Sequence, residues 1–219
     1  MSPIMLDIIL IAVIAGICIF AYIKGLFIAL FNFGSSIVAM IAAYIFHPIF
    51  ADLLEKTPLF NAIKEPIFEA LDKAGKDMGL KTAEAFVQEL NLPSVISNKI
   101  LQQVNSQDTS VMVSQISDVL TGIIISVIAV VVLFIIIKLL LLLLKNVIKG
   151  LVKLPVIRET DKIGGLVLGV LEAFVLLTVI GAVFTLFSGS VDGSFMEAVD
   201  NSIIARFFYY NNLIIALLR

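Results

Sequence analysis

The chain has 219 residues, of which 60% are hydrophobic and 15% are charged, and its mean hydropathy is +1.11. A soluble domain is closer to half apolar and a quarter charged, so this composition argues against an ordinary soluble protein. The formal net charge of −2 gives no reason to expect nucleic-acid binding, and the single cysteine, Cys18, excludes an intramolecular disulfide.

Four segments, at about 4–23, 26–46, 119–144 and 162–187, are each long enough for the roughly 20 apolar residues that cross a ~30 Å hydrocarbon core. The alternative is a soluble protein with very apolar helices, but the run 122–137 is apolar on every face. The sequence therefore predicts an all-α, polytopic membrane protein with four transmembrane helices. Its expected parts are a transmembrane hairpin (1–46), a helical extracytoplasmic cap (47–118), spans three and four with a basic loop at 145–162 (119–187), and an interfacial tail (188–219).

The first two spans are separated by very few polar residues. Span one begins at Pro3, which suits a first helical turn, and carries Asp7 near its outer end. The turn at Lys24 and Gly25 is so short that spans one and two are expected to form an antiparallel hairpin. Gly25 fits a helix terminus, where a positive φ is often needed.

Residues 47–118 contain three short apolar stripes at helical spacing. Thr57 and Pro58 are predicted to start the first helix, as its N-cap and its first residue. Pro66 is predicted to kink or split this helix. Asp108 is predicted to cap a helix that continues into span three. The helices either pack on one another as a cap or lie in the outer headgroup plane, and their acidic polar faces favour the cap. The stripes are Leu59, Phe60, Ile63, Ile67, Phe68 and Leu71; Leu80, Ala83, Phe86, Val87 and Leu90; and Val95, Ile96, Ile100, Leu101 and Val104.

The positive charges gather in one loop. Residues 145–162 carry five Lys or Arg residues against two acids, whereas 47–118 carries ten carboxylates and six lysines. Cytoplasmic loops carry the Lys/Arg excess, so both termini and the cap are expected outside. Lys145, Lys149 and Lys153 either form a basic interfacial helix that ends at Pro155 or only set this orientation.

Small residues recur every four positions within the spans, and in lipid such stripes allow helix backbones to approach closely. They predict a tight bundle, or alternatively a contact between copies of the chain. The residues concerned are Gly165, Gly169 and Ala173 in span four, Ser35, Ala39 and Ala43 in span two, and Ala12 and Gly16 in span one.

Two charged residues fall within the predicted spans. At about 1.5 Å per residue, Glu172 lies roughly 15 Å and Lys138 about 10 Å from the inner ends of their helices. An ionised carboxylate facing lipid at this depth costs several kcal/mol, so Glu172 should face the interior, pair or stay protonated, and Lys138 could also snorkel to the inner surface unaided. The sequence leaves two interpretations open, a Glu172–Lys138 bridge that fixes helix rotation and an acid on a proton or ion path.

Three short motifs lie at the ends of the spans, namely Asp7; Lys24, Gly25, Leu26 and Phe27; and Asp161, Lys162, Gly165 and Gly169. These motifs resemble those of the CvpA family, the colicin V production proteins of bacterial inner membranes. The resemblance covers about 1–46 and 119–187 and implies a role in toxin production or export and in envelope homeostasis, in the bacterial cytoplasmic membrane. It assigns no molecular activity, and Glu172 matches no family motif.

The sequence shows no motif for catalysis or for binding a cofactor, metal or nucleic acid, and its single histidine, His47, is expected at the outer interface. We therefore expect a non-enzymatic membrane scaffold or accessory. Its expected partners are the lipid bilayer and either a second copy or other envelope proteins. The alternative is a small oligomeric transporter or channel that uses Glu172 and Lys138.

Overall fold

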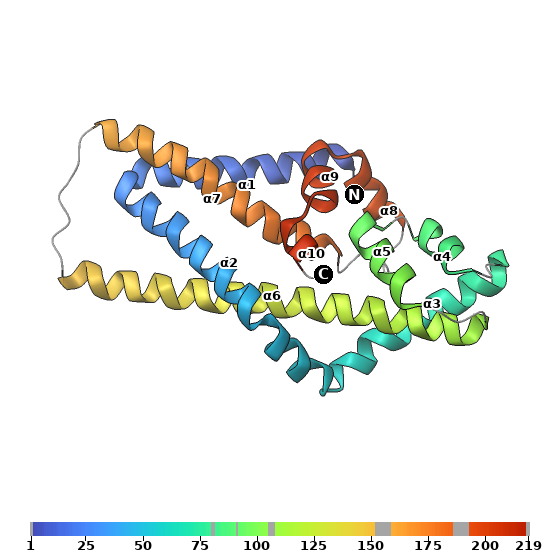
Figure 1. The fold of residues 1–219 in the computed structure, drawn as a ribbon. Coiled ribbons are helices and arrows are strands. Elements are labelled where there is room, and N and C mark those ends of the chain that lie inside the picture. The colour runs from blue at the N-terminus through green and yellow to red at the C-terminus, as the bar shows by residue number, and fades with distance from the viewer. Residues whose placement is uncertain are drawn as a thin grey trace.

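The computed structural model describes residues 2–79, 82–90, 92–104, 108–151, 159–185 and 193–217, which form ten helices and no strand (Figure 1). Four helices are long and apolar enough to cross a membrane, namely α1, α2, α6 over 109–144 and α7 over 161–184. This confirms the predicted all-α fold with four candidate spans. The helices are α1 (Pro3–Lys24), α2 (Leu26–Glu55), α3 (Leu59–Met78), α4 (Ala83–Glu89), α5 (Ser94–Gln103), α6 (Thr109–Leu151), α7 (Glu159–Thr185), α8 (Gly193–Asn201), α9 (Ile203–Tyr210) and α10 (Leu213–Leu217).

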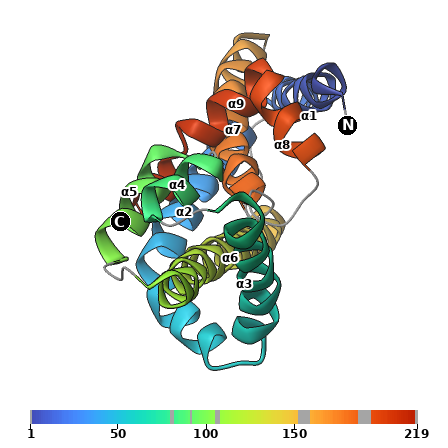
Figure 2. The same cartoon turned by 90° about the vertical axis from the view of Figure 1, so that its right-hand side faces the viewer.

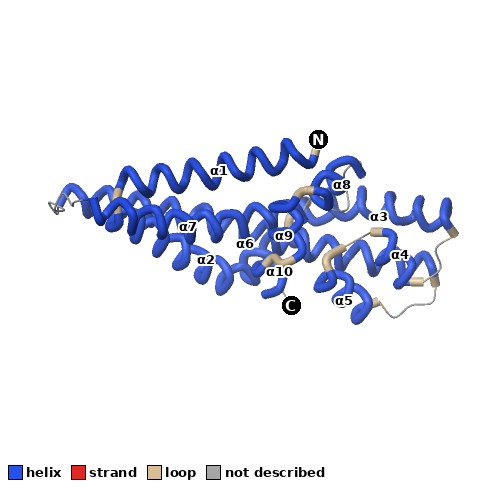
Figure 3. The backbone as a smooth tube through the Cα atoms, turned by 90° about the horizontal axis from the view of Figure 1, so that it is seen from above, coloured by secondary structure: helices blue, strands red, loops and turns tan. Residues whose placement is uncertain are grey.

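The four long helices pack in the order α1, α7, α2, α6. From the turn at Gly25, α1 and α2 diverge, and α7 packs against both of them (Figures 1 and 3). The N-terminus and the tail helices lie toward the end of the bundle opposite that turn (Figure 1). Exposed side chains such as Ile8, Ile19, Ile41 and Leu140 give the bundle an apolar outer surface, as lipid contact requires.

Helix α2 continues through Pro48 to Glu55, beyond the expected end of span two near residue 46. A proline inside a helix leaves the carbonyl four residues earlier without its usual N–H donor. Here that carbonyl belongs to Tyr44, and its oxygen lies 2.6 Å from Nδ1 of His47, whose ring also stacks on Tyr44. His47 therefore supplies the hydrogen bond that Pro48 removes, in the tautomer with a proton on Nδ1.

Helices α3 and α5 pack on the first half of α6, and α4 packs on α5 (Figure 2). Their buried side chains share one core with α6, including Ile67 and Leu71 of α3, Phe86 of α4, and Ile96 and Ile100 of α5. Packing on protein is therefore the arrangement that the structure shows for these stripes. An ion pair of 2.6 Å between Lys64 and Asp118 adds a polar contact between α3 and α6.

Two local predictions for this region differ from the structure. Helix α3 is not split at Pro66, which is exposed, while Ile67 and Leu71 just after it are buried in the core that α3 shares with α6. The N-cap of α3 is Pro58 rather than Thr57, and the Thr57 hydroxyl accepts a hydrogen bond from the Leu59 amide at 3.3 Å.

The start of α6 matches the sequence prediction. The Asp108 carboxylate accepts hydrogen bonds from the Ser110 hydroxyl and amide, at 2.7 and 2.9 Å, and from the Val111 amide. These bonds hold the pKa of Asp108 below its usual value of 3.8, since they favour the charged form. From this cap α6 runs without a break into the third span.

The tail packs back onto the bundle. Helices α8 and α9 cover the N-terminal end of α1 and the C-terminal half of α7, with Leu6, Leu177, Val199 and Tyr209 in one cluster. Helix α10 reaches α5, α6 and α7, between the spans and the cap helices (Figure 3). Leu80 of the second stripe and residues 152–158 of the predicted basic loop lie outside the described residues.

Candidate functional site

Lys138 of α6 and Glu172 of α7 form an ion pair within the bundle. The Lys138 Nζ lies 2.8 Å from Oε1 of Glu172, and the two side chains are only 14% and 9% exposed. The same ammonium donates a hydrogen bond to Oγ of Ser36 on α2. Three membrane helices thus meet at one compensated charge pair.

The Phe134 ring and the fixed orientation of the Ser36 hydroxyl also support the Lys138 ammonium. The Phe134 ring centroid lies 5.9 Å from Nζ, within the range of a cation–π contact. Ser36 in turn donates to the backbone oxygen of Asn32 at 3.0 Å, which orients its oxygen toward the lysine. The pair is therefore supported by an aromatic face and by an oriented hydroxyl, as a buried charge needs.

Ser36 and Glu172 lie at similar depths. Ser36 is about ten residues, or about 15 Å, from the first residue of α2, and Glu172 is about eleven residues, or about 16 Å, from Asp161, where the candidate span of α7 begins. That depth is close to the middle of a ~30 Å hydrocarbon core, where water is scarce and an unpaired charge is costly. The pairing removes that cost without requiring either side chain to reach the surface.

Gly165 and Gly169 of α7 contact α1 and not the ion pair. A Cβ added to Gly165 would lie 2.5 Å from the Ala21 carbonyl oxygen, and one added to Gly169 would lie 2.7 Å from the Ala21 Cβ. Only glycine allows the backbones of α1 and α7 to come this close. One turn further along α7, Ala173 is also buried.

Among the other small residues of the predicted stripes, those of α2 are buried and Gly16 of α1 is exposed. Ser35, Ala39 and Ala43 of α2 are buried, as expected for a packing stripe. Gly16 is not at a helix contact, because it is exposed and no described atom lies within 4 Å of the Cβ it would carry. Helix α1 approaches α7 through Ile17, Cys18 and Ala21, so Gly16 lies off that contact.

The structure brings the Lys24–Gly25 turn together with Asp161. Oδ1 of Asp161 accepts a hydrogen bond of 2.7 Å from the Leu26 amide, at the first turn of α2. Gly25 has φ +81°, and a Cβ there would overlap the Asp161 carboxylate. A carboxylate at a helix N-terminus is favoured by the helix dipole, so Asp161 fastens α7 to the start of α2.

The flanking lysines lie on aromatic rings at the same end. Lys24 Nζ is 5.5 Å from the Phe20 ring, and Lys162 Nζ is 5.9 Å from the Tyr22 ring. Both contacts keep a cation at the end of α1, where headgroups are expected.

Asp7 binds a helix N-terminus at the opposite end of the bundle, as Asp161 does near the turn at Gly25. Its Oδ1 accepts from the Ser202 hydroxyl at 2.6 Å and the Ile204 amide at 3.1 Å, and its Oδ2 accepts from the Ile203 amide at 3.2 Å. The carboxylate thus binds the N-terminus of α9 and fixes the tail against α1.

Sequence reasoning missed Ser36 and Ser202. The signal for Ser36 was two adjacent serines in an otherwise apolar span, but only one of them reaches Lys138. Ser202 lacked a signal, since nothing in the sequence relates it to Asp7 almost 200 positions away.

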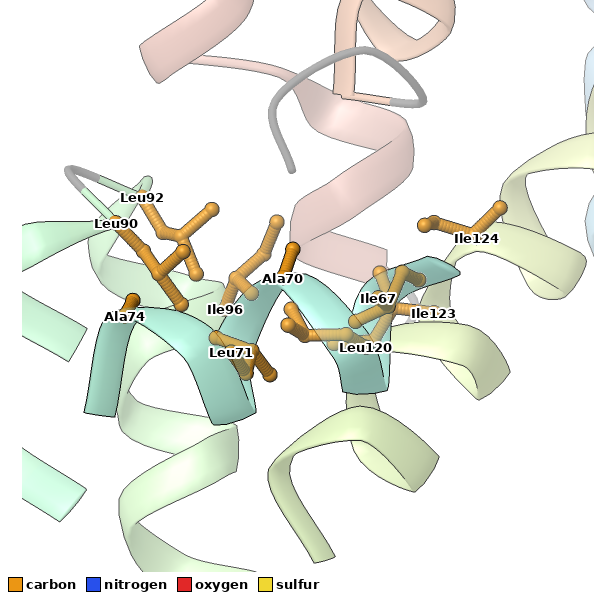
Figure 4. Close-up of a pocket in the computed structure, with 10 residues that line it drawn as sticks. All are labelled: Ile67, Ala70, Leu71, Ala74, Leu90, Leu92, Ile96, Leu120, Ile123 and Ile124. Carbon is orange, nitrogen blue, oxygen red and sulfur yellow. The ribbon is translucent and has the colours of Figure 1, made fainter. Parts of the chain in front are cut away.

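The cavity and grooves described below are lined mainly by apolar side chains, with Asp52 and Lys56 at the groove along α2 as charged exceptions. A cavity of about 80 Å³ between α3, α5 and α6 is lined only by Ile, Leu and Ala side chains (Figure 4). Further grooves lie along α2, between α2, α7 and α10, and between α1, α7 and α9, and neither Lys138 nor Glu172 lines any of them. Among the described residues, no group of three His, Cys, Asp or Glu side chains is placed to hold a metal.

A sequence model of the family described as Colicin V production protein matches residues 6–87 and 95–212 of the chain. These ranges include Asp7, the turn at Gly25, the ion pair, the Asp161 contact and most of the tail. No match was found among curated proteins or among solved structures.

Proposed function

The chain belongs to the colicin V production protein family, and from this premise we propose that it acts as a non-enzymatic membrane scaffold or accessory. Its role would be in the production or export of a toxin of the colicin V type and in envelope homeostasis. We place it in the bacterial cytoplasmic membrane with both termini outside. Its partners would be the bilayer and either a second copy or other envelope proteins.

The observation that carries the proposal is the ion pair. A transport path that uses Glu172 and Lys138 would need water or a solute to reach these charged groups. Glu172 is instead bonded to Lys138, which is bonded to Ser36, and both charged side chains are largely buried between three helices. This geometry supports a device that fixes the relative positions of α2, α6 and α7.

The close contacts at both ends of the bundle support the same interpretation. Asp161 binds the first turn of α2, and Asp7 binds the first turn of α9. Together with the Gly165 and Gly169 contacts, these bonds hold the membrane helices and the tail in one arrangement. A rigid bundle with a helical cap is suited to a protein that acts by binding partners rather than by catalysis.

A test in cells uses a strain that lacks the chain and carries a colicin V-type toxin. We expect weaker toxin export and a leakier envelope without the chain, and recovery with the wild type. The double variant Lys138→Met/Glu172→Met should also restore both, because a structural pair can be replaced by apolar side chains of similar volume. A double variant that is well folded but inactive would favour the transporter alternative, and normal export without the chain would refute the proposed role.

A further inference from the structure

A groove of about 420 Å³ lies between α1, α7 and the tail helix α9. Every side chain that lines it is apolar, including Ile14 of α1, Val170 and Phe174 of α7, and Ile204 and Phe207 of α9. Apolar lining at a membrane-exposed surface selects a hydrocarbon chain over a polar solute.

The depth of the groove places it in one leaflet. Val170 lies about 14 Å along α7 from Asp161, near mid-span, and Leu177 lies about 10 Å further toward the end that carries the chain termini. Acyl chains of the leaflet on that side occupy the same depth. Helix α9 crosses the upper end of the groove and is held there by the three hydrogen bonds to Asp7.

Helix α9 also supplies a cation. Arg206 is exposed, and it lies beside Ile203 and Phe207, two groove-lining residues of α9 that are 83% and 51% exposed. At about 100° per residue, Arg206 is about 60° around the helix from Ile203 and about 160° from Ile204, so it borders the groove on its Ile203 side. Among the described residues Arg206 forms no salt bridge, and the nearby Asp200 carboxylate accepts a hydrogen bond from Tyr210.

We propose that this groove and Arg206 together bind one anionic glycerophospholipid of the leaflet on the side of the chain termini. An acyl chain follows Val170 and Phe174, and the guanidinium of Arg206 binds the phosphate, for which its planar fork of donors is suited. The net negative headgroup is preferred because it complements a cation on an otherwise apolar face. The site does not depend on the proposed cellular role.

The chain contains no tryptophan, so a single introduced tryptophan reports on its own surroundings. The full-length Val170→Trp variant is placed in dioleoylphosphatidylcholine vesicles with rising fractions of dibrominated phosphatidylglycerol or dibrominated phosphatidylcholine. We expect the anionic lipid to reach half-maximal quenching at about fivefold lower mole fraction, the preference that one cation near the surface provides. Val38→Trp is the matched control, since Val38 is 52% exposed on α2 and does not line the groove.

Substitution of Arg206 distinguishes a specific lipid-binding site from general contact with lipid. In the Val170→Trp background, Arg206→Ala should abolish the preference and Arg206→Lys should retain part of it. Both positions are exposed, and size-exclusion profiles would verify that the variants remain folded. Three results would each overturn the proposal. They are equal quenching by both lipids at Val170→Trp, a lipid preference that survives Arg206→Ala, and the same lipid preference at Val38→Trp.

Discussion

Removal of Glu172 tests whether the ion pair holds the bundle together. In Glu172→Leu the Lys138 ammonium loses its carboxylate while it stays mostly buried between α2, α6 and α7. Breaking a buried pair on one side costs about 3–5 kcal/mol. We expect a value near 3 kcal/mol, because Lys138 keeps Ser36 and the Phe134 ring and is 14% exposed, so its long side chain can shift toward the surface.

Lys138→Met/Glu172→Met removes both charges and keeps the apolar volume. Its free energy of unfolding should lie within about 1 kcal/mol of the wild type, since the cost of desolvating the two charges disappears together with their attraction. The assay is equilibrium unfolding in mixed micelles with a rising mole fraction of dodecyl sulfate, followed by far-ultraviolet circular dichroism. A Glu172→Leu variant as stable as the wild type, or a double variant as unstable as Glu172→Leu, would show that the ion pair does not hold the bundle together in this way.

Four further predictions concern packing, capping and pH. Gly165→Ala should destabilise the bundle by about 1–3 kcal/mol in the same unfolding assay, because its Cβ meets backbone, whereas Gly16→Ala should be neutral or stabilising. Asp7→Ala should cost about 1 kcal/mol and speed proteolysis of the tail, which loses its helix cap; unchanged proteolysis would contradict this role. Ala74→Val should raise the free energy of unfolding by about 0.5–1 kcal/mol because it fills the cavity of Figure 4, and a loss of stability would show that the cavity cannot accept a side chain. Burial and the bond to Asp200 raise the pKa of Tyr210 from 10.0 to about 12, so its contribution to stability is present below pH 10 and is lost as the pH rises to 12; an ultraviolet titration in which Tyr210→Phe removes no component near 12 would contradict this.

The spans and the cap stripes could be predicted because they follow from single-helix patterns. Apolar length gives four spans, and the 3.6-residue period gives the faces that α3, α4 and α5 bury. The start of α6 at Asp108 also follows from local cap chemistry. In each case the signal lies within a few turns of the residues that it describes.

Contacts between distant helices were harder to predict. The Lys138–Glu172 bridge was one of two interpretations, since depth shows that two charges can meet but not that they do. Nothing local showed that Asp7 would bind the start of α9 or that Asp161 would bind the start of α2. Helix α3 continues through Pro66, and Gly16 lies away from the contact between α1 and α7, because tertiary contacts decide both.

We infer that the intramembrane charges of Lys138 and Glu172 fix helix positions and do not conduct ions. The most direct test is proton and ion flux in proteoliposomes that contain the wild type, Glu172→Gln or Lys138→Met/Glu172→Met, each checked for a folded state by circular dichroism. We expect no flux above that of empty liposomes from any of the three proteins. Flux that the wild type supports and both folded variants lose would contradict the account and make Glu172 part of a conducting path.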